Sequence, residues 1–302
     1  MPATLPNTVL APSGRRPRVL TAAPLPTPVP TPVPTPTPLA LPRPHELDIW
    51  QVTVGEQEEA TADVQRVLDA AERRRWSQFR SPADRNRYAT AHLALRRLLG
   101  SYLAVDPADV VLDREPCPLC AEPHGRPAVP GSGLHFSLSH SGDQVLLAFG
   151  PTPVGVDVER LPDAAVADEL ATTLHPRETA ELALLAGPED RRAAFGRCWC
   201  RKEAYLKGIG TGLGVSPDVD YVGTGPGPAG LPRWTLMDLT VARGYAAAVA
   251  YAAPGPPHGP WSRPEIGPEI GPEIGPEIGP EIGPEIGPEI RNISAEHRGQ
   301  VP

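Results

Sequence analysis

Hydrophobic and polar positions alternate strictly along residues 154 to 160, which read VGVDVER. This period of two is typical of a β-strand, whose successive side chains point to opposite faces. The valines therefore share one face, and Asp157 and Glu159 share the other, about 7 Å apart along the backbone. Such a pair either faces solvent or belongs to a site for a hard metal ion, and the stretch alone favours neither interpretation.

Two strands are predicted immediately before this one. The segment LHFSLSHSGDQVLLAFG indicates a strand up to Ser139, a turn at residues 141 to 143, and a second strand from Gln144 to Phe149. Residues 154 to 159 follow after a short GPTP connection, so three strands come in succession, which predicts a meander. Further on, GYAAAVAYAA predicts a late strand.

Two long helices are predicted from their starting signals. In SPADRNRYATAHLALRRLLGSYL, Ser81 is the expected N-cap, Pro82 lies in the first turn, Asp84 completes a capping box, and Gly100 lies near the end. The segment GPEDRRAAFGRCWCRKEAYLKGIG begins in the same way at Pro188, at an offset of about a hundred residues.

The order of these elements repeats along the chain, which predicts an α+β fold of two similar halves. We assign residues 45 to 150 and 151 to 253 to the halves, packed with approximate two-fold symmetry around a cleft. Residues 1 to 44 are rich in proline, and residues 254 to 302 contain a PEIG repeat. Neither has the periodicity of an element, so we expect a disordered arm and an acidic low-complexity tail.

Composition narrows the class of protein. The chain has 302 residues and is 40% hydrophobic, which is enough for a core. It contains no apolar stretch of signal-peptide or membrane-span length, so we expect a soluble, cytoplasmic protein that does not bind membranes. The net charge of -8 argues against nucleic acid as a partner.

The four cysteines are expected to be thiols in this compartment. Cys117 and Cys120 form CPLC and are followed by His124, which resembles half of a zinc site. No second half follows at zinc-finger spacing, so ordinary loop cysteines are the favoured interpretation over a local zinc site.

Lysine is used at only two positions among 28 basic residues, Lys202 and Lys207, and both lie in WCRKEAYLKG. Helical spacing places Trp199, Glu203 and Lys207 on one face. A surface Glu–Lys pair would explain that spacing, but the arginine-rich composition favours a requirement for an ammonium group. Lysine is a compact, flexible charge that can follow a phosphate oxygen. We therefore favour a functional role for Lys207 and leave Lys202 open.

Three further residues are candidates for phosphate binding. Ser139 and His140 end a strand where it enters a turn, and a hydroxyl, an imidazole and turn amides can together hold a phosphate. Arg126 stands beside Pro127 in HGRPAV, a cation on a stiffened loop. A structural histidine and an ordinary surface arginine remain the alternatives.

Four motifs together resemble one enzyme family. GRP, FSLSHSG, VGVDVE and WCRKEAYLKGIGTGL occur in the order and spacing of the 4′-phosphopantetheinyl transferase superfamily, in its pseudo-dimeric type that activates peptide and polyketide synthetases. The resemblance covers roughly residues 45 to 253. It implies that the acidic face of VGVDVER holds a metal ion.

The resemblance also implies the roles of individual residues. Asp157, Glu159 and Glu203 match the Mg²⁺ ligands of the family, and Lys207 matches a lysine on the coenzyme A pyrophosphate. Arg126 and His140 match positions that contact coenzyme A phosphates, with Arg87 as a looser match, while Trp199 matches a packing position. Ser139, next to His140, is the further candidate for coenzyme A binding.

The implied reaction moves the 4′-phosphopantetheine arm of coenzyme A to a serine of an acyl or peptidyl carrier domain and releases adenosine 3′,5′-bisphosphate. The catalytic residues are then Asp157, Glu203 and Lys207. Glu203 is the candidate general base, although metal ligation competes for the same carboxylate.

Carrier proteins are usually acidic, so a basic docking patch is expected. ERRRWSQFR supplies Arg73, Arg74, Arg75 and Arg80, with a solvated helix face as the alternative. We expect a monomer, because the two halves can complete the site between them. The rival functions are another Mg²⁺-dependent phosphotransferase or hydrolase, and a non-catalytic coenzyme A-binding module.

Overall fold

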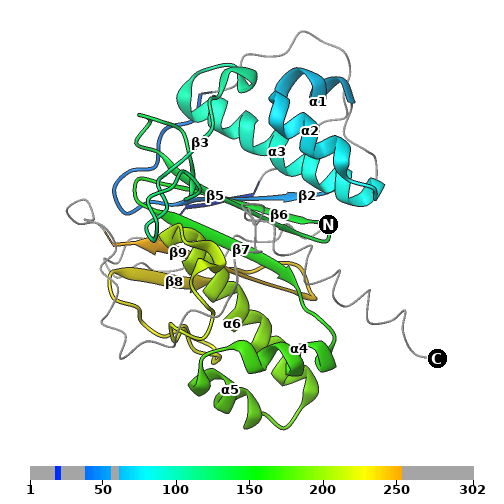
Figure 1. The fold of residues 1–302 in the computed structure, drawn as a ribbon, viewed down its shortest axis with the longest axis vertical. Coiled ribbons are helices and arrows are strands. Elements are labelled where there is room, and N and C mark those ends of the chain that lie inside the picture. Colours follow the sequence, from blue (N-terminus) through cyan, green and yellow to red (C-terminus); the bar gives the residue numbers. More distant parts are fainter. Residues whose placement is uncertain (1–17, 22–37, 56–60, 254–302) are drawn as a thin grey trace.

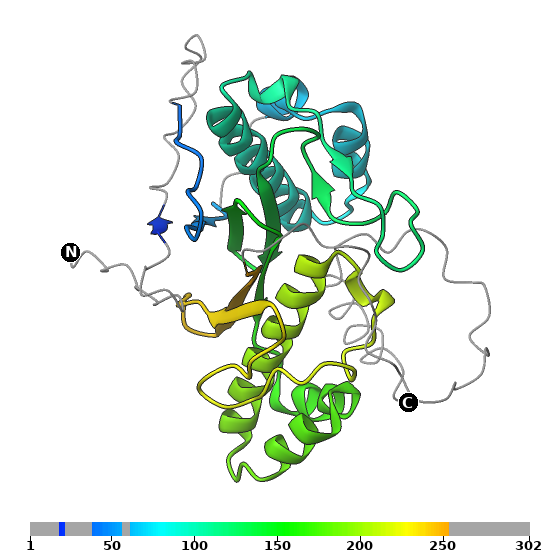
Figure 2. The same ribbon diagram turned by 90° about the vertical axis from the view of Figure 1, so that its left-hand side faces the viewer.

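The computed structural model describes residues 18–21, 38–55 and 61–253. Helices and mainly antiparallel sheets are stacked in four layers, with the two larger sheets facing each other at the centre (Figure 1; Figure 2). This confirms the predicted α+β class. No helix in the described part of the chain is long and apolar enough to cross a bilayer.

The first sheet has the strand order β1-β2-β6-β5 and carries helices on its outer face. Its strands are β1 (Arg18–Thr21), β2 (Asp48–Thr53), β5 (His135–Ser141) and β6 (Gln144–Gly150). The helices are α1 (Thr61–Val67), α2 (Ala70–Gln78) and α3 (Pro82–Leu103). Between α3 and β5 lie the short helix η1 (Pro107–Asp109) and a small ribbon of β3 (Asp113–Arg114) and β4 (Pro127–Ala128).

The second sheet has the order β7-β9-β8. Its strands are β7 (Val154–Arg160), β8 (Trp234–Asp238) and β9 (Tyr245–Ala252). Its outer face is covered by α4 (Ala164–Leu170), α5 (Pro176–Ala183) and α6 (Pro188–Ile209), with short helices η2 (Ala171–Thr173) and η3 (Gly212–Gly214). The helices α3 and α6 have 22 residues each and both begin with proline, as their starting signals predict.

The N-cap of α3 differs from its prediction in one detail. The Ser81 hydroxyl accepts a hydrogen bond from the Asp84 amide at 3.4 Å, as expected of a cap. The Asp84 carboxylate forms an ion pair with Arg87 rather than completing a capping box.

The predicted meander is wrong, because β7 leaves the first sheet. The hairpin of β5 and β6 forms, but β7 pairs with β9 in the second sheet. The valines of β7 pack against Leu146 and Ala148 of β6, across the interface between the sheets. The other face of β7 lies against α6, so β7 is buried on both faces. A strand is buried on both faces in this way when its sheet lies between another sheet and a helix. The apolar residues between the two sheets occupy the centre of the region where we predicted a cleft.

The ends of the chain bear on the predicted arm and tail. Arg18–Thr21 forms β1, which pairs in parallel with β2, and the Leu39 amide donates to the Ser101 carbonyl at 3.0 Å. These parts of the predicted disordered arm are therefore structured. Residues 1–17, 22–37 and 254–302, including the PEIG tail, lie outside the described residues. The two-fold relation and the division at residue 150 remain predictions.

Candidate active site

The two larger sheets are joined along the edges of β5 and β7 by three serines. Ser137, Ser139 and Ser141 accept hydrogen bonds from the amides of Val156, Val158 and Arg160 at 3.0, 3.3 and 2.9 Å. Two of these hydroxyls also donate to the acidic face of β7. Ser139 donates to Asp157 and Ser141 donates to Glu159, each at 2.8 Å. We call this row the serine seam.

Asp157 lies at the centre of the seam and is 2% exposed. Its Oδ1 accepts from the Ser139 hydroxyl and from Lys207 Nζ, both at 2.8 Å. Its Oδ2 is buried and has no hydrogen-bond partner among the described residues. A buried carboxylate oxygen without a partner is costly, so this atom marks the position where a cation or donor would be held.

Gly155 brings α6 close enough to complete the site. A side chain at Gly155 would collide with the backbone of α6 at Ala204 and Gly208. The close approach places Glu203 and Lys207, one helical turn apart, against Asp157. Trp199, one turn earlier, is buried and stacks on Phe195 with ring centroids 5.8 Å apart, as expected for a packing residue.

The buried charges at this point shift one another's pKa values. Desolvation and the charge of Asp157 raise the pKa of Glu203 to about 7, while Lys207 acts in the opposite direction. Desolvation lowers the pKa of Lys207, but Asp157, Glu203 and Glu159 outweigh it and the net pKa is raised. Lys207 is therefore held as an ammonium ion among three carboxylates, and its Nζ also donates to the Ser139 hydroxyl at 3.0 Å.

The three carboxylates fit a hard cation by their chemistry, since Mg²⁺ prefers carboxylate oxygens. Asp157 Oδ2 supplies a free buried oxygen, Glu203 is 6% exposed, and Glu159 is half-buried at the end of the same strand face. In the described arrangement they do not bring one oxygen each within 4.8 Å of one another. The strand prediction is confirmed, but the acidic face lies against α6 rather than facing solvent.

His140 points away from the seam, toward α3. Strand β5 continues through Ser141, two residues beyond its predicted end, so Ser139 and His140 lie within the strand and face opposite ways. Desolvation, with the charges of Arg87, His92 and Lys207, lowers the pKa of His140 to about 3. Its Nδ1 is buried and has no hydrogen-bond partner in the described structure. The imidazole is therefore neutral and lies near the cationic side chains of Arg87 and Lys207.

Arg87 and Arg126 are both held by contacts within the protein. Arg87 donates to the Gly142 carbonyl at 3.3 Å, in addition to its ion pair with Asp84. Arg126 is paired with Glu115 and donates to the Gly208 carbonyl near the end of α6 at 2.5 Å. Arg126 thus links the segment before β4 to the end of α6, which makes it more than an ordinary surface arginine.

Lys202, which the sequence left open, does not join the site. Its Nζ forms an ion pair with Glu178 at 2.7 Å and donates to the Asp220 carbonyl at 2.5 Å. Glu178 is 0% exposed and also accepts from the amides of Val222 and Gly223 at 2.7 and 3.1 Å. This network ties α5 and α6 to the loop before β8, so the role of Lys202 is structural.

Ser137 and Ser141 are the members of the seam that the sequence analysis missed. Their signal is present in SLSHS, where serines recur with the period of a strand face. The pattern marks polar groups on one face, although it does not show that a second strand edge lies opposite.

Comparison with known proteins agrees with the motifs. The sequence profile of the 4′-phosphopantetheinyl transferase superfamily matches residues 153–250. The chain is 33% identical to the 4′-phosphopantetheinyl transferase HetI of Nostoc sp., over 70% of this chain and 89% of that protein. It is 32% identical to a phosphopantetheinyl transferase of Thraustochytrium sp., over 57% of this chain and 63% of that protein.

A third relative is the 4′-phosphopantetheinyl transferase Sfp of Bacillus subtilis, which is 29% identical over 51% of this chain and 70% of that protein. These relatives are named as transferases, which favours an enzyme over a non-catalytic binding module. The similarity to HetI extends over most of both chains and includes the segment that forms the site. The chain therefore belongs to the 4′-phosphopantetheinyl transferase superfamily and is an enzyme of that class.

Proposed function

We propose that this enzyme transfers the 4′-phosphopantetheine arm of coenzyme A to a serine of acyl or peptidyl carrier domains, in a Mg²⁺-dependent reaction. The observation that carries the proposal is the buried Asp157, which shares Lys207 with Glu203 and keeps one oxygen without a partner. Phosphoryl transfer needs in-line positioning and charge neutralisation, and this cluster offers groups for both.

Asp157, Glu159 and Glu203 would hold the metal ion. When bound, Mg²⁺ supplies neutralisation of the negative charge on the pyrophosphate of coenzyme A. The serine seam fixes the first two carboxylates, since Ser139 and Ser141 each donate to one of them. The approach of α6 at Gly155 brings the third.

The reaction exchanges one phosphorus–oxygen bond for another. The carrier serine oxygen attacks the phosphorus that bears pantetheine, and the bond to the adenosine phosphate breaks, so adenosine 3′,5′-bisphosphate leaves with the electron pair. Lys207, held as an ammonium ion, stabilises the charge on the leaving phosphate. Glu203 is the candidate acceptor of the serine proton. Its duties as base and as metal ligand compete.

Cationic and polar groups beside this cluster would bind coenzyme A. Arg87, His92 and Lys207 surround the neutral His140, whose buried Nδ1 can pair with a polar atom of the ligand. We assign phosphate contacts to Arg87, His140 and Ser139. Arg126 completes this set in our proposal, although its guanidinium already bonds to Glu115 and Gly208.

An acidic carrier domain would dock on the basic face of α2 and its following loop. Arg74, Arg75 and Arg80 are exposed there. Arg73 is half-buried and donates to the carbonyl of Gln65 at 3.3 Å, so we remove it from the predicted patch. We propose that the enzyme acts as a cytoplasmic monomer with two-fold related halves, on carriers of peptide or polyketide synthetases.

The test is the intact mass of an apo carrier domain incubated with coenzyme A, Mg²⁺ and the full chain. We expect the carrier to gain one phosphopantetheine arm. Asp157→Ala should abolish the gain, whereas Asp168→Ala, which breaks an exposed ion pair with Arg191 on the outer helices, should leave it intact. Thermal melting of both variants separates loss of chemistry from loss of fold.

The outcomes distinguish the proposal from its rival. Turnover of coenzyme A without any carrier product, across several acyl and peptidyl carriers, would favour a different Mg²⁺-dependent hydrolase. Transfer that persists in a folded Asp157→Ala variant would refute the assignment of the site. Transfer that is independent of added Mg²⁺ in the presence of EDTA would refute the metal requirement.

A further inference from the structure

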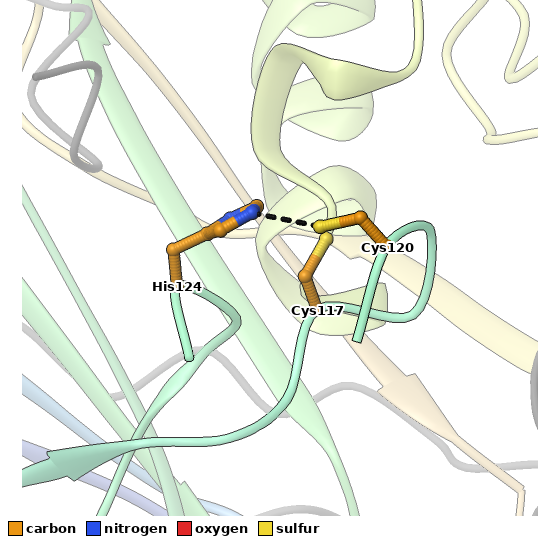
Figure 3. A group of neighbouring side chains, drawn as sticks. All are labelled: Cys117, Cys120 and His124. Atoms are coloured by element: carbon orange, nitrogen blue, oxygen red, sulfur yellow. Dashed lines mark hydrogen bonds between the residues drawn. The ribbon is translucent and has the colours of Figure 1, made fainter. Parts of the chain in front are cut away.

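A second group of metal-binding side chains lies outside the active site, on the connection between β3 and β4. Cys117, Cys120 and His124 each bring one ligand atom within 4.8 Å of the others, and in Figure 3 the two sulfurs and the imidazole point toward one another. Cys120 Sγ lies 3.0 Å from His124 Nε2. Among the described residues, no other set of three histidine, cysteine or acidic side chains meets this condition.

The backbone of residues 117 to 124 is folded so that these side chains meet. The amide of Cys117 donates to the Glu122 carbonyl at 2.7 Å, and the amide of Ala121 donates to the Cys117 carbonyl at 2.8 Å. Ala121 has a φ of 63°, the left-handed region that alanine rarely adopts. We call this closed loop the knuckle. The turn and its two hydrogen bonds close the loop and bring the three side chains to one side of it.

We propose that the knuckle binds a zinc ion through Cys117, Cys120 and His124. Thiolate and imidazole ligands select zinc, whereas Mg²⁺ takes oxygen ligands, so the ion is distinct from that of the active site. At usual Zn–S and Zn–N lengths, a tetrahedral site separates sulfur and nitrogen by roughly 3.6 Å. The distance between Cys120 Sγ and His124 Nε2 would therefore need to increase by about half an ångström to admit the ion. Cys120 and His124 are exposed, so solvent can fill the fourth position.

The knuckle lies beside the C-terminal end of α6. Leu119 packs against Gly214, just beyond α6. Arg126 lies two residues after the knuckle and donates to the Gly208 carbonyl near the end of α6. Lys207 is the neighbour of Gly208 along the helix. A zinc ion that rigidifies residues 117 to 124 would therefore fix the loop that abuts the end of the catalytic helix, as a positioning element.

The test uses the full chain without an affinity tag, purified from zinc-supplemented medium and exchanged into metal-free buffer. Elemental analysis should give one zinc per chain for the wild type, and none for Cys120→Ser or His124→Asn. Two matched controls should keep their zinc. Cys198→Ala removes a buried thiol of α6, away from the knuckle, and Asp157→Ala removes a carboxylate of the active site.

Two further measurements use the wild-type chain alone, so they test the inference even if a variant folds poorly. Co²⁺ added to the chelator-treated wild type should give the intense visible bands of a tetrahedral thiolate site, which Zn²⁺ then removes. Hydrogen exchange of the peptide spanning residues 113 to 128 should be slowed by Zn²⁺ alone, because the amides of Cys117, Ala121 and Gly125 are hydrogen-bonded within this loop.

Three results would overturn the inference. The first is a wild-type protein with reduced thiols and no bound zinc or Co²⁺ spectrum. The second is a disulfide between Cys117 and Cys120 in place of the metal. The third is zinc that is retained in both Cys120→Ser and His124→Asn. None of these measurements depends on transferase activity, so failure here leaves the proposed reaction untouched.

Discussion

Replacing Ser139 by alanine tests whether the serine seam holds the catalytic carboxylate. Ser139 is 6% exposed. Its hydroxyl makes three hydrogen bonds: it donates to Asp157 and accepts from the Val158 amide and from Lys207 Nζ. Ser139→Ala removes all three. It leaves a buried amide without an acceptor and deprives a buried carboxylate of a donor.

The expected cost follows from these contacts. A hydrogen bond to a charged group contributes about 1.5–3 kcal/mol, and an unsatisfied buried amide costs about 1–3 kcal/mol. Because these terms overlap, we expect Ser139→Ala to lower the free energy of unfolding by about 3 kcal/mol. The matched control is Ser137→Ala on the same face of β5. Ser137 accepts only from the Val156 amide, so its loss should cost about 1 kcal/mol.

Urea unfolding followed by tryptophan fluorescence measures both free energies, and carrier modification measures the activity. We expect kcat/KM to fall about tenfold for Ser139→Ala, equivalent to about 1.4 kcal/mol in the transition state, because Asp157 and Lys207 lose their common partner. Ser137→Ala should retain wild-type activity. Equal losses of stability and activity in the two variants would refute the reasoning, since the seam would then act only as a structural joint.

Three other perturbations follow from the same contacts. Gly155→Ala places a methyl group against the backbone of α6, so soluble yield and circular dichroism should reveal little folded protein, and a native-like variant would contradict the close approach. Lys202→Met leaves Glu178 buried without its cation, and urea unfolding should show a loss of about 3–5 kcal/mol that Glu178→Gln in the same chain partly restores. The pKa of Glu203 is raised to about 7 from 4.5, so its protonated form stabilises the folded state; this contribution is complete below pH 4.5 and is lost as the pH rises through about 7. Thermal melting in EDTA should show this loss in the wild type and not in Glu203→Gln, and identical profiles would contradict it.

Local patterns predicted those parts of the fold that depend on neighbouring residues. The alternation in VGVDVER correctly predicted which side chains of β7 share a face. A proline in the first turn correctly marked the start of both long helices. The meander prediction was wrong because the alternation of residues along a strand does not determine which other strand it pairs with. Strand β7 pairs with β9, about ninety residues further along the chain. In that sheet one face of β7 packs against the first sheet and the other lies against α6.

The site was predicted in its residue types but not in its contacts. The rarity of lysine singled out Lys202 and Lys207 together, although five residues along a helix place them about 140° apart. They therefore point to different partners, Glu178 and Asp157. Similarly, the spacing of Cys117, Cys120 and His124 was visible, but their convergence depends on a turn at Ala121 that no sequence signal marks.

The use of serines at the joint between the halves has a chemical reason. A backbone carbonyl at the edge of β5 could accept the amide hydrogens of β7, but it could donate nothing in return. A hydroxyl accepts and donates at once. Ser139 accepts from Val158 while donating to Asp157, and Ser141 accepts from Arg160 while donating to Glu159.

The seam therefore satisfies the free edge of β7 with three hydroxyls, and two of them, on Ser139 and Ser141, also orient the carboxylates. An ordinary β-ladder would also join the two strand edges, yet it would deprive Asp157 and Glu159 of the hydroxyl donors that Ser139 and Ser141 supply. The same arrangement makes the site depend on the contact between the halves. Asp157 is held from one side by Ser139 of β5 and from the other by Lys207 of α6, so a shift of one half against the other would break one of these two bonds.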